Sequence, residues 1–251
     1  MEQTLATRYE ILEELLAKAQ TKPELVSVLS VSRSTVDRGI SDLLEMGCVE
    51  REGSTYSATE SGRLAFREYE AYTRNLETIT EATPILNTLD PETIDLQFLR
   101  GATIDLPDPR APWKAFETSM QLVHAANSLT GTAPAVFQRF FEDLMASVRN
   151  DGLACELTID TTLFESFDET ELKQLRAIVQ ADGGSLLVTD LEDSYAIWIA
   201  DTGENGHAGL TVYGDSGVVG IIHNDDPDAV AWVKDRYRER KETATVVWNF
   251  D

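Results

Sequence analysis

The stretch "SVSRSTVDRGISDLLEMGCVEREG", residues 30–53, constrains the fold of this chain most. Ser32 can cap a helix that Gly47 ends, and apolar residues recur between them at helical spacing. On a helical wheel the buried side of this helix is formed by Val36, Ile40, Leu43 and Leu44. Two short extended pieces follow around the turn "EGST" and predict a hairpin over residues 48–58. The stretch therefore predicts a helix with one polar face, followed directly by a hairpin.

The flanking residues complete a recognisable order of elements. Apolar residues at helical spacing predict a first helix over residues 5–19, and Pro23 can open a short second helix. Thr59 can cap a long helix that runs to about Thr80. The order helix, helix, turn, helix, hairpin, helix is that of a winged helix-turn-helix.

The segments "PELVSVLSVSRSTV" and "LLEMGCVEREGSTYSATESG" closely resemble the DNA-binding domain of archaeal and bacterial winged-helix regulators of the ArsR, MarR and TrmB-like kind. The resemblance spans about residues 5–70. Its most specific parts are the helix start "VSRSTV", the approach to the wing and the "T-x-x-G" after the wing. The resemblance implies that this domain binds double-stranded DNA.

The helix over residues 33–46 supplies the candidate DNA-contacting side chains. Its exposed side carries Arg38, which can donate two hydrogen bonds to a guanine edge, and short hydroxyl side chains suited to bases or phosphates. Arg33, on the flank, suits a phosphate contact, as does Lys22 at the start of the second helix. The predicted set is Lys22, Ser32, Arg33, Ser34, Thr35, Arg38, Ser41, Arg51, Ser54 and Thr55.

A plainer interpretation of the same helix stays open. It is an ordinary solvated surface in which Arg38 pairs with Asp42 one turn later, a contact worth only a few tenths of a kcal/mol. Glu50 and Glu52 in the wing also count against DNA binding, because they repel phosphates unless cations intervene.

Beyond a linker expected at residues 84–90, the pattern changes to that of a mixed α/β domain, so we expect domains at 1–82 and 83–251. The segments "YAIWIA", "AGLTVYG" and "VVGIIHN" predict an antiparallel meander, and Asp226-Pro227 opens a terminal helix. The remaining prediction is extended structure within 93–106, helices over 112–126, 135–149 and 169–180, and strands over 128–131, 153–159 and 185–189.

The second region is similar to the C-terminal half of haloarchaeal regulators that join a winged helix to the middle domain of methanogenesis regulatory proteins. The similarity covers roughly residues 84–245, and "NDDPDAVAWVKDRYRERKE" is its most particular piece. It implies an α/β domain that senses an effector or holds a dimer, of a kind distantly likened to the phospholipase D fold.

Ligands of α/β sheets gather at the carboxyl ends of strands. The strand ends nominate Thr130, Gly131, Asp160 and Thr161, with His223 near the end of a meander strand. The candidates whose side chains can contact a small-molecule effector are Thr130, Asp160, Thr161 and His223. Each also has a structural interpretation, as a turn, a helix cap or a partly buried residue at a strand end.

No enzyme site or cofactor site is predicted. "GDSG" at 214–217 surrounds the nucleophile of trypsin-like proteases, but here it separates two short strands and fits a hairpin turn. The three histidines lack the His-x-Lys spacing that phospholipase D chemistry needs. Cys48 and Cys155 have no partner spacing typical of a disulfide framework or a metal site.

The charge of the chain is strongly acidic, with 44 acidic and 21 basic residues and a net charge of −23. Residues 1–82 hold 15 acidic and 9 basic residues, and the remainder holds 29 and 12, so most of the excess lies in the second domain. This is typical of proteins from salt-loaded cytoplasm, where a Debye length of about 3 Å screens self-repulsion. We expect a cytoplasmic halophilic protein that does not enter a membrane, and whose DNA affinity depends weakly on KCl or rises with it.

These patterns together favour a transcription regulator that binds a pseudo-palindromic operator as a homodimer. The alternative is a protein-interaction module of the transcription or replication machinery that does not bind specific DNA sequences.

Overall fold

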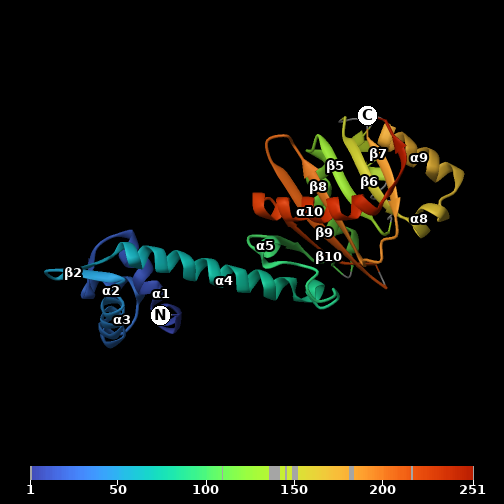
Figure 1. The fold of residues 1–251 in the computed structure, drawn as a ribbon. Helices are drawn as coiled ribbons and strands as arrows, with labels where there is room; N and C mark the ends of the chain where they lie inside the picture. Colours follow the sequence, from blue (N-terminus) through green and yellow to red (C-terminus); the bar gives the residue numbers. More distant parts are fainter. Residues whose placement is uncertain are drawn as a thin grey trace. The chain divides into compact units, whose positions relative to one another are not determined.

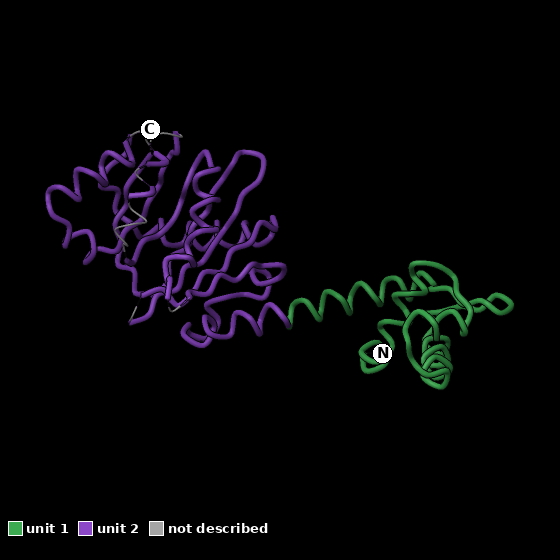
Figure 2. The backbone as a smooth tube through the Cα atoms, turned by 180° about the vertical axis from the view of Figure 1, so that it is seen from behind, with its two compact units in different colours: residues 1–76 green, residues 77–251 purple. Residues whose placement is uncertain are grey.

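A computed structural model describes residues 2–108, 110–135, 142–144, 146–148, 152–180, 184–215 and 217–250. The chain forms two compact units, Met1–Leu76 (unit 1) and Glu77–Asp251 (unit 2), coloured separately in Figure 2. Most of the helix predicted over 135–149 lies outside the described residues, as does Ser216 of the "GDSG" turn.

Unit 1 has the element order of a winged helix, as predicted (Figure 1). Its three small strands form one sheet in the order β1-β3-β2, in which β2 and β3 are the wing hairpin. Its elements are α1 (Glu2–Ala17), β1 (Gln20–Thr21), α2 (Lys22–Leu29), α3 (Arg33–Glu45), β2 (Val49–Glu52), β3 (Thr55–Ala58) and the first part of α4 (Glu60–Leu86).

The core of unit 1 is built by α1 packing closely on α3. Val36, Ile40 and Leu43 are buried as the helical wheel indicates, but Leu44 is 37% exposed, so its predicted burial was wrong. Gly39 permits the close approach of the two helices, because a Cβ atom there would lie 2.3 Å from Ile11 Cδ1. This small core holds α3 with its polar side outward.

Helix α4 contradicts the linker expected from residue 84. It begins after Thr59, whose Oγ1 accepts a hydrogen bond from Gly62 N at 3.1 Å, and it continues through Pro84 to Leu86. Ala82 and Ile85 are fully buried in the core of unit 2. We conclude that burial of these apolar side chains outweighs the helix hydrogen bond that proline removes.

Unit 2 is built on an eight-stranded mixed sheet in the order β11-β7-β6-β5-β8-β9-β10-β4. Strands β5, β6 and β7 are parallel, and all other neighbours are antiparallel, including the predicted meander of β8, β9 and β10. The strands are β4 (Thr103–Asp105), β5 (Ser128–Ala133), β6 (Ala154–Asp160), β7 (Ser185–Thr189), β8 (Tyr195–Asp201), β9 (Gly206–Gly214), β10 (Gly217–Asn224) and β11 (Thr245–Asn249).

Helices cover both faces of this sheet and enclose two apolar cores. One face packs against α10, which crosses it in Figure 1, and against α5. The other packs against α6 and α9. The helical elements described in full are α5 (Leu96–Leu99), the 3-10 helix η1 (Pro112–Phe116), α6 (Glu117–His124), α8 (Thr161–Ser166), α9 (Glu169–Gln180) and α10 (Pro227–Thr243).

Three elements of unit 2 differ from the sequence prediction. Residues 96–99, expected to be extended, form α5 because the Asp95 carboxylate caps it by accepting from Gln97 N at 2.7 Å, while Phe98 stacks on Trp232. Strand β11, which was not predicted, pairs with β7 at the edge of the sheet. The short helix α8 was not predicted either.

Candidate nucleic-acid interface and ligand cavities

The start of α3 is fixed by a cluster of hydroxyl groups. Ser32 Oγ accepts a hydrogen bond from Thr35 N at 3.1 Å, which makes Ser32 the N-cap of the helix. The same oxygen lies 2.9 Å from Ser34 Oγ and 2.8 Å from Thr35 Oγ1. Ser32 and Ser34 are exposed and Thr35 is half-buried, so this hydroxyl cluster stands at the surface where the helix begins.

Both aspartates of α3 are paired with cations from other helices. Lys22 Nζ lies 2.8 Å from Asp37 Oδ1, and Arg8 Nε lies 2.9 Å from Asp42 Oδ2. The hydrogen bond from Lys22 lowers the pKa of the Asp37 carboxyl group, and the nearby positive charge of Arg33 lowers it further. Their negative charge is therefore compensated within unit 1.

Arg38 is a cation of α3 that this pairing leaves available, as is Arg33. The interpretation that pairs it with Asp42 is not what the structure shows, because Asp42 binds Arg8. Arg38 is exposed, and it makes no hydrogen bond or ion pair with any other residue that the structure describes. Ser34, Arg38 and Ser41 are all exposed at a spacing that places them along one side of α3.

The side chains of the wing are held by local contacts. Arg51 Nε donates a hydrogen bond to the carbonyl oxygen of Gly53 at 2.8 Å, and its guanidinium lies 5.7 Å from the ring centroid of Tyr56. Thr55 Oγ1 donates to the carbonyl oxygen of Glu52 at 2.8 Å, while Ser54 at the tip is exposed. A cation thus stands near the tip in a fixed position.

Lys22 is more engaged than its predicted phosphate contact requires. Besides the ion pair with Asp37, its Nζ lies 5.7 Å from the ring centroid of Tyr56. The phosphate role of Lys22 stays a prediction, and it would require the lysine to share its charge with Asp37.

The four candidate effector residues do not come together in unit 2. Thr130 lines an open polar cavity of about 300 Å³ on the α10 side of the sheet, where Lys241 Nζ pairs with Glu156 Oε2 at 2.7 Å. His223 is buried on the opposite face, its Nε2 3.2 Å from Asp105 Oδ2. The structure therefore offers no single site that these four residues share.

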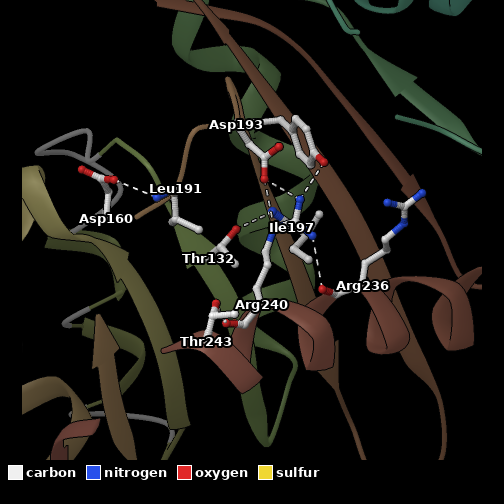
Figure 3. Close-up of polar contacts among 9 residues, drawn as sticks. Thr132, Asp160, Leu191, Asp193, Ile197, Arg236, Arg240 and Thr243 are labelled. Carbon is white, nitrogen blue, oxygen red and sulfur yellow. Dashed lines mark hydrogen bonds and ion pairs between the residues drawn. The ribbon is translucent and has the colours of Figure 1, made fainter. Parts of the chain in front are cut away.

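Asp160 is a structural cap at the end of β6. Its carboxylate accepts hydrogen bonds from Leu163 N at 3.1 Å and from Leu191 N at 2.9 Å, the second of which is drawn in Figure 3. Burial acts to raise the pKa of Asp160, but these backbone donors outweigh it and lower the pKa overall. Thr161 is the first residue of the helix that Asp160 caps.

The segment after β7 is fastened to α10 by a second network (Figure 3). Arg240 Nε donates to Asp193 Oδ2 at 3.0 Å, and Arg240 Nη2 donates to the Tyr195 hydroxyl at 2.6 Å. With the bond from Leu191 to Asp160, these contacts tie the segment 190–195 to both α8 and α10. They are structural contacts within unit 2.

An enclosed apolar cavity of about 80 Å³ lies beside those strand ends, between the sheet and the layer of α6 and α9. Of the residues nominated at the strand ends only Gly131 lines it, because the rest of the described lining consists mainly of apolar and small residues without a chemical signature. Among the described residues it is lined by Phe116, Ser119, Val123, Leu129, Gly131, Thr132, Ala133, Ala135, Leu144, Leu157, Ile159, Leu175, Ala196, Trp198, Thr211 and Tyr213.

Neither a membrane-crossing helix nor a metal cluster is found in the part of the chain that the structure describes. No helix there has the length and apolar character needed to cross a membrane. The same residues contain no group of three or more histidine, cysteine, aspartate or glutamate side chains that could hold a metal ion.

Comparison with protein families gives two matches. The family described as methanogenesis regulatory protein FilR1, middle domain, matches residues 112–243. The family described as HVO_A0261 N-terminal domain matches residues 3–81. Among curated protein sequences no significant match is found.

Three solved structures show the range of structural similarity. TrmBL2, described as an archaeal chromatin protein with a novel mode of DNA binding, is 15% identical, with 98% of each chain covered and a TM-score of 0.45. NucT from Helicobacter pylori is 11% identical over 58% of this chain and 98% of that one, with a TM-score of 0.46. The IclR protein of Thermotoga maritima is 13% identical over 97% of each chain, with a TM-score of 0.23. TM-scores this low carry no argument about the function of this chain.

Proposed function

The chain belongs to the family of the methanogenesis regulatory protein FilR1 middle domain, and on this premise we propose that it is a DNA-binding transcription regulator. Unit 1 supplies the contact with DNA and unit 2 responds to an effector. The observation that carries the proposal is the surface of α3. Its two aspartates are paired with Lys22 and Arg8, while Arg38 stands exposed without a partner among the described residues.

This arrangement supports insertion of α3 into a major groove. An arginine there donates two hydrogen bonds to a guanine edge, and the exposed Ser34 and Ser41 can donate to bases or phosphates. Arg33 and Arg51 suit phosphate contacts beside the groove. Pairing of the two aspartates also lowers the repulsion that a phosphate backbone would otherwise meet at α3.

Arg38→Ala tests this function. DNA sites are first recovered by genome-wide mapping of sequences bound in the host, and affinity for one such site is then measured by fluorescence anisotropy. We expect a loss of about 1 to 3 kcal/mol and relaxed sequence preference at one base position. Arg74→Ala on α4 removes an exposed arginine of the same unit and should leave affinity unchanged. Unaltered affinity in Arg38→Ala would favour the protein-interaction module instead.

We further propose that the regulator is a homodimer paired through α4. Leu64, Tyr72 and Leu76 are 52%, 46% and 45% exposed, which is high for large apolar side chains. An open groove of about 690 Å³ runs beside two of them, between α1 and α4. A second copy would cover this surface and present two recognition helices to a two-fold operator.

The double variant Leu64→Glu/Tyr72→Glu tests the pairing. Two carboxylates on this apolar surface should yield a monomer, seen as a halved mass in light scattering after size-exclusion chromatography. Arg74→Glu changes the charge at an exposed position on another side of the same helix and should stay dimeric. A dimer that survives the double variant would place the interface elsewhere.

A further inference from the structure

The enclosed cavity of unit 2 is lined in part by small residues, at core positions where larger apolar side chains would ordinarily fill the space. Ala133 at the end of β5 and Ala196 in β8 both face it. Protein interiors are close-packed, and neighbouring positions on adjoining strands are normally occupied by larger apolar side chains. Gly131 differs from the two alanines, because a Cβ atom there would lie 2.8 Å from the Ile197 carbonyl oxygen.

The size of the cavity limits what it can hold. A volume of about 80 Å³ exceeds the roughly 10 to 15 Å³ that one water needs, and it is well below the ~300 Å³ at which pockets for drug-sized ligands begin. The walls are mainly aliphatic and aromatic, with Phe116, Leu175 and Trp198 among them. A compact apolar molecule of a few non-hydrogen atoms fits this description.

A buried threonine hydroxyl gives the cavity a specific polar requirement. Thr211, which is only 5% exposed, accepts a hydrogen bond at its Oγ1 from Trp198 Nε1 at 3.2 Å. The hydroxyl can also donate its hydrogen, and it has no acceptor for that hydrogen among the described residues. An acceptor within the cavity would complete it.

We propose that this cavity binds a small, largely apolar molecule that carries one hydrogen-bond acceptor, such as a carbonyl oxygen. The proposal rests on the proposed function, in which unit 2 responds to an effector, and it names the chemical class of that effector. The apolar part of the ligand fills the space above Ala133 and Ala196, and its acceptor receives a hydrogen bond from Thr211. The position beside the carboxyl ends of the parallel strands is where α/β sheets bind ligands.

The first experiment measures binding of two probes of the same shape to the full chain. Cyclopentanone carries a carbonyl acceptor, and methylenecyclopentane has a CH₂ group in its place. Binding is followed by the indole N–H signals in the ¹H–¹⁵N NMR spectrum, with the Trp198 signal identified by its loss in Trp198→Phe. We expect saturable shifts of the Trp198 signal, with cyclopentanone binding about fivefold more tightly, as one added hydrogen bond implies. Absence of saturable binding by either probe would overturn the proposal, and equal affinities would overturn its polar part.

Variants then locate the binding site. Ala196→Leu fills the cavity and should abolish binding of both probes, whereas Ala231→Leu, the same change at an exposed position of α10, should not. If the leucine variant fails to fold, as judged by circular dichroism, Ala133→Val provides a smaller filling of the same space. Thr211→Val should make the two affinities equal, and Thr211→Ser should restore the preference. Binding that survives the filling variants would contradict the cavity as the site.

A negative result for ligand binding can be distinguished from a negative result for DNA binding. Probe binding is measured without DNA and depends only on unit 2, while the loss of affinity in Arg38→Ala depends only on unit 1. A bound probe that leaves DNA affinity unchanged would show a ligand site without regulation, and it would overturn the assignment of this chemical class to the effector.

Discussion

Units 1 and 2 place their candidate functional residues in opposite environments. In unit 1 these residues lie on the surface of α3 and the wing, around a small core that only holds the helix in position. In unit 2 the candidate ligand site is enclosed, and its walls are part of the core itself. The difference teaches that a mutation can alter the function of unit 1 without touching its fold, whereas in unit 2 function and packing change together.

Of the changes considered, Phe98→Ala should have the largest effect on the stability of one unit while leaving the function of the other unchanged. Phe98 is fully buried in unit 2 and stacks on Trp232 at a centroid distance of 5.2 Å. Its loss leaves a cavity that should lower the free energy of unfolding of unit 2 by about 3 to 5 kcal/mol. The measurement is urea unfolding followed by the fluorescence of the tryptophans, all of which lie in unit 2. Leu96→Ala, at a 41% exposed position of α5, is the matched control.

DNA affinity provides the second readout of the same variant. Under conditions where unit 2 of the variant remains folded, affinity should equal that of the wild type. A loss of DNA affinity under these conditions would mean that the change in the core of unit 2 alters unit 1 as well.

Gly62→Ala is the corresponding change in unit 1, with a somewhat smaller expected effect. A Cβ atom at residue 62 would lie 2.1 Å from the carbonyl oxygen of Cys48, so the start of α4 or the approach to the wing must shift. We expect a destabilisation of unit 1 by about 1 to 3 kcal/mol, measured as loss of its helical circular dichroism signal in urea. Ser61→Ala, one residue earlier and exposed, should have little effect. If Gly62→Ala is as stable as the wild type, the close contact has been absorbed by the backbone.

Asp160→Asn should give the smallest of the three effects and should depend on pH. The folded state lowers the pKa of this carboxyl group, so its contribution to stability is present above the unfolded pKa, near 4, and is lost as pH falls through the lower folded value. The variant should be less stable than wild type by about 1 kcal/mol near neutral pH, as for other lost caps. The difference should shrink in acid, which thermal unfolding at several pH values can measure.

The control for this prediction is Glu165→Gln. Glu165 is exposed on α8 and accepts no hydrogen bond from another described residue. A difference between wild type and Asp160→Asn that stays constant down to low pH would contradict the role of the ionised carboxylate as cap.

The sequence predicted unit 1 well because its signals are local. The cap at Ser32, the apolar spacing of α3 and the turn of the wing all lie within a few turns of chain, and they suffice to place Arg38 on the exposed side. What they could not supply is the partner of Asp42, because Arg8 lies 34 residues away. The interpretation that pairs Arg38 with Asp42 is wrong because Asp42 is bound by Arg8, a contact that the local sequence pattern does not show.

Unit 2 was predicted in outline, with its alternating strands and helices and its meander, but its candidate site was not. His223, Thr130 and Asp160 were chosen because we expected them at the ends of strands, and the structure distributes them over two faces and a cap. The cavity is instead marked by Ala133 and Ala196, which only strand pairing and helix packing bring to one space. Small apolar residues do not indicate a cavity in the sequence, because a cavity depends on which residues pack around them.

The two alanines of the cavity also bear on how this protein would respond to selection in the laboratory. Filling an internal void is among the commonest routes to a more heat-resistant protein. A screen that rewards only thermal resistance should therefore favour larger residues at positions 133 and 196. Such variants would be more resistant to heat, but they would no longer bind the proposed effector. Selection for thermal resistance and selection for a response to the effector would therefore favour different residues at these two positions.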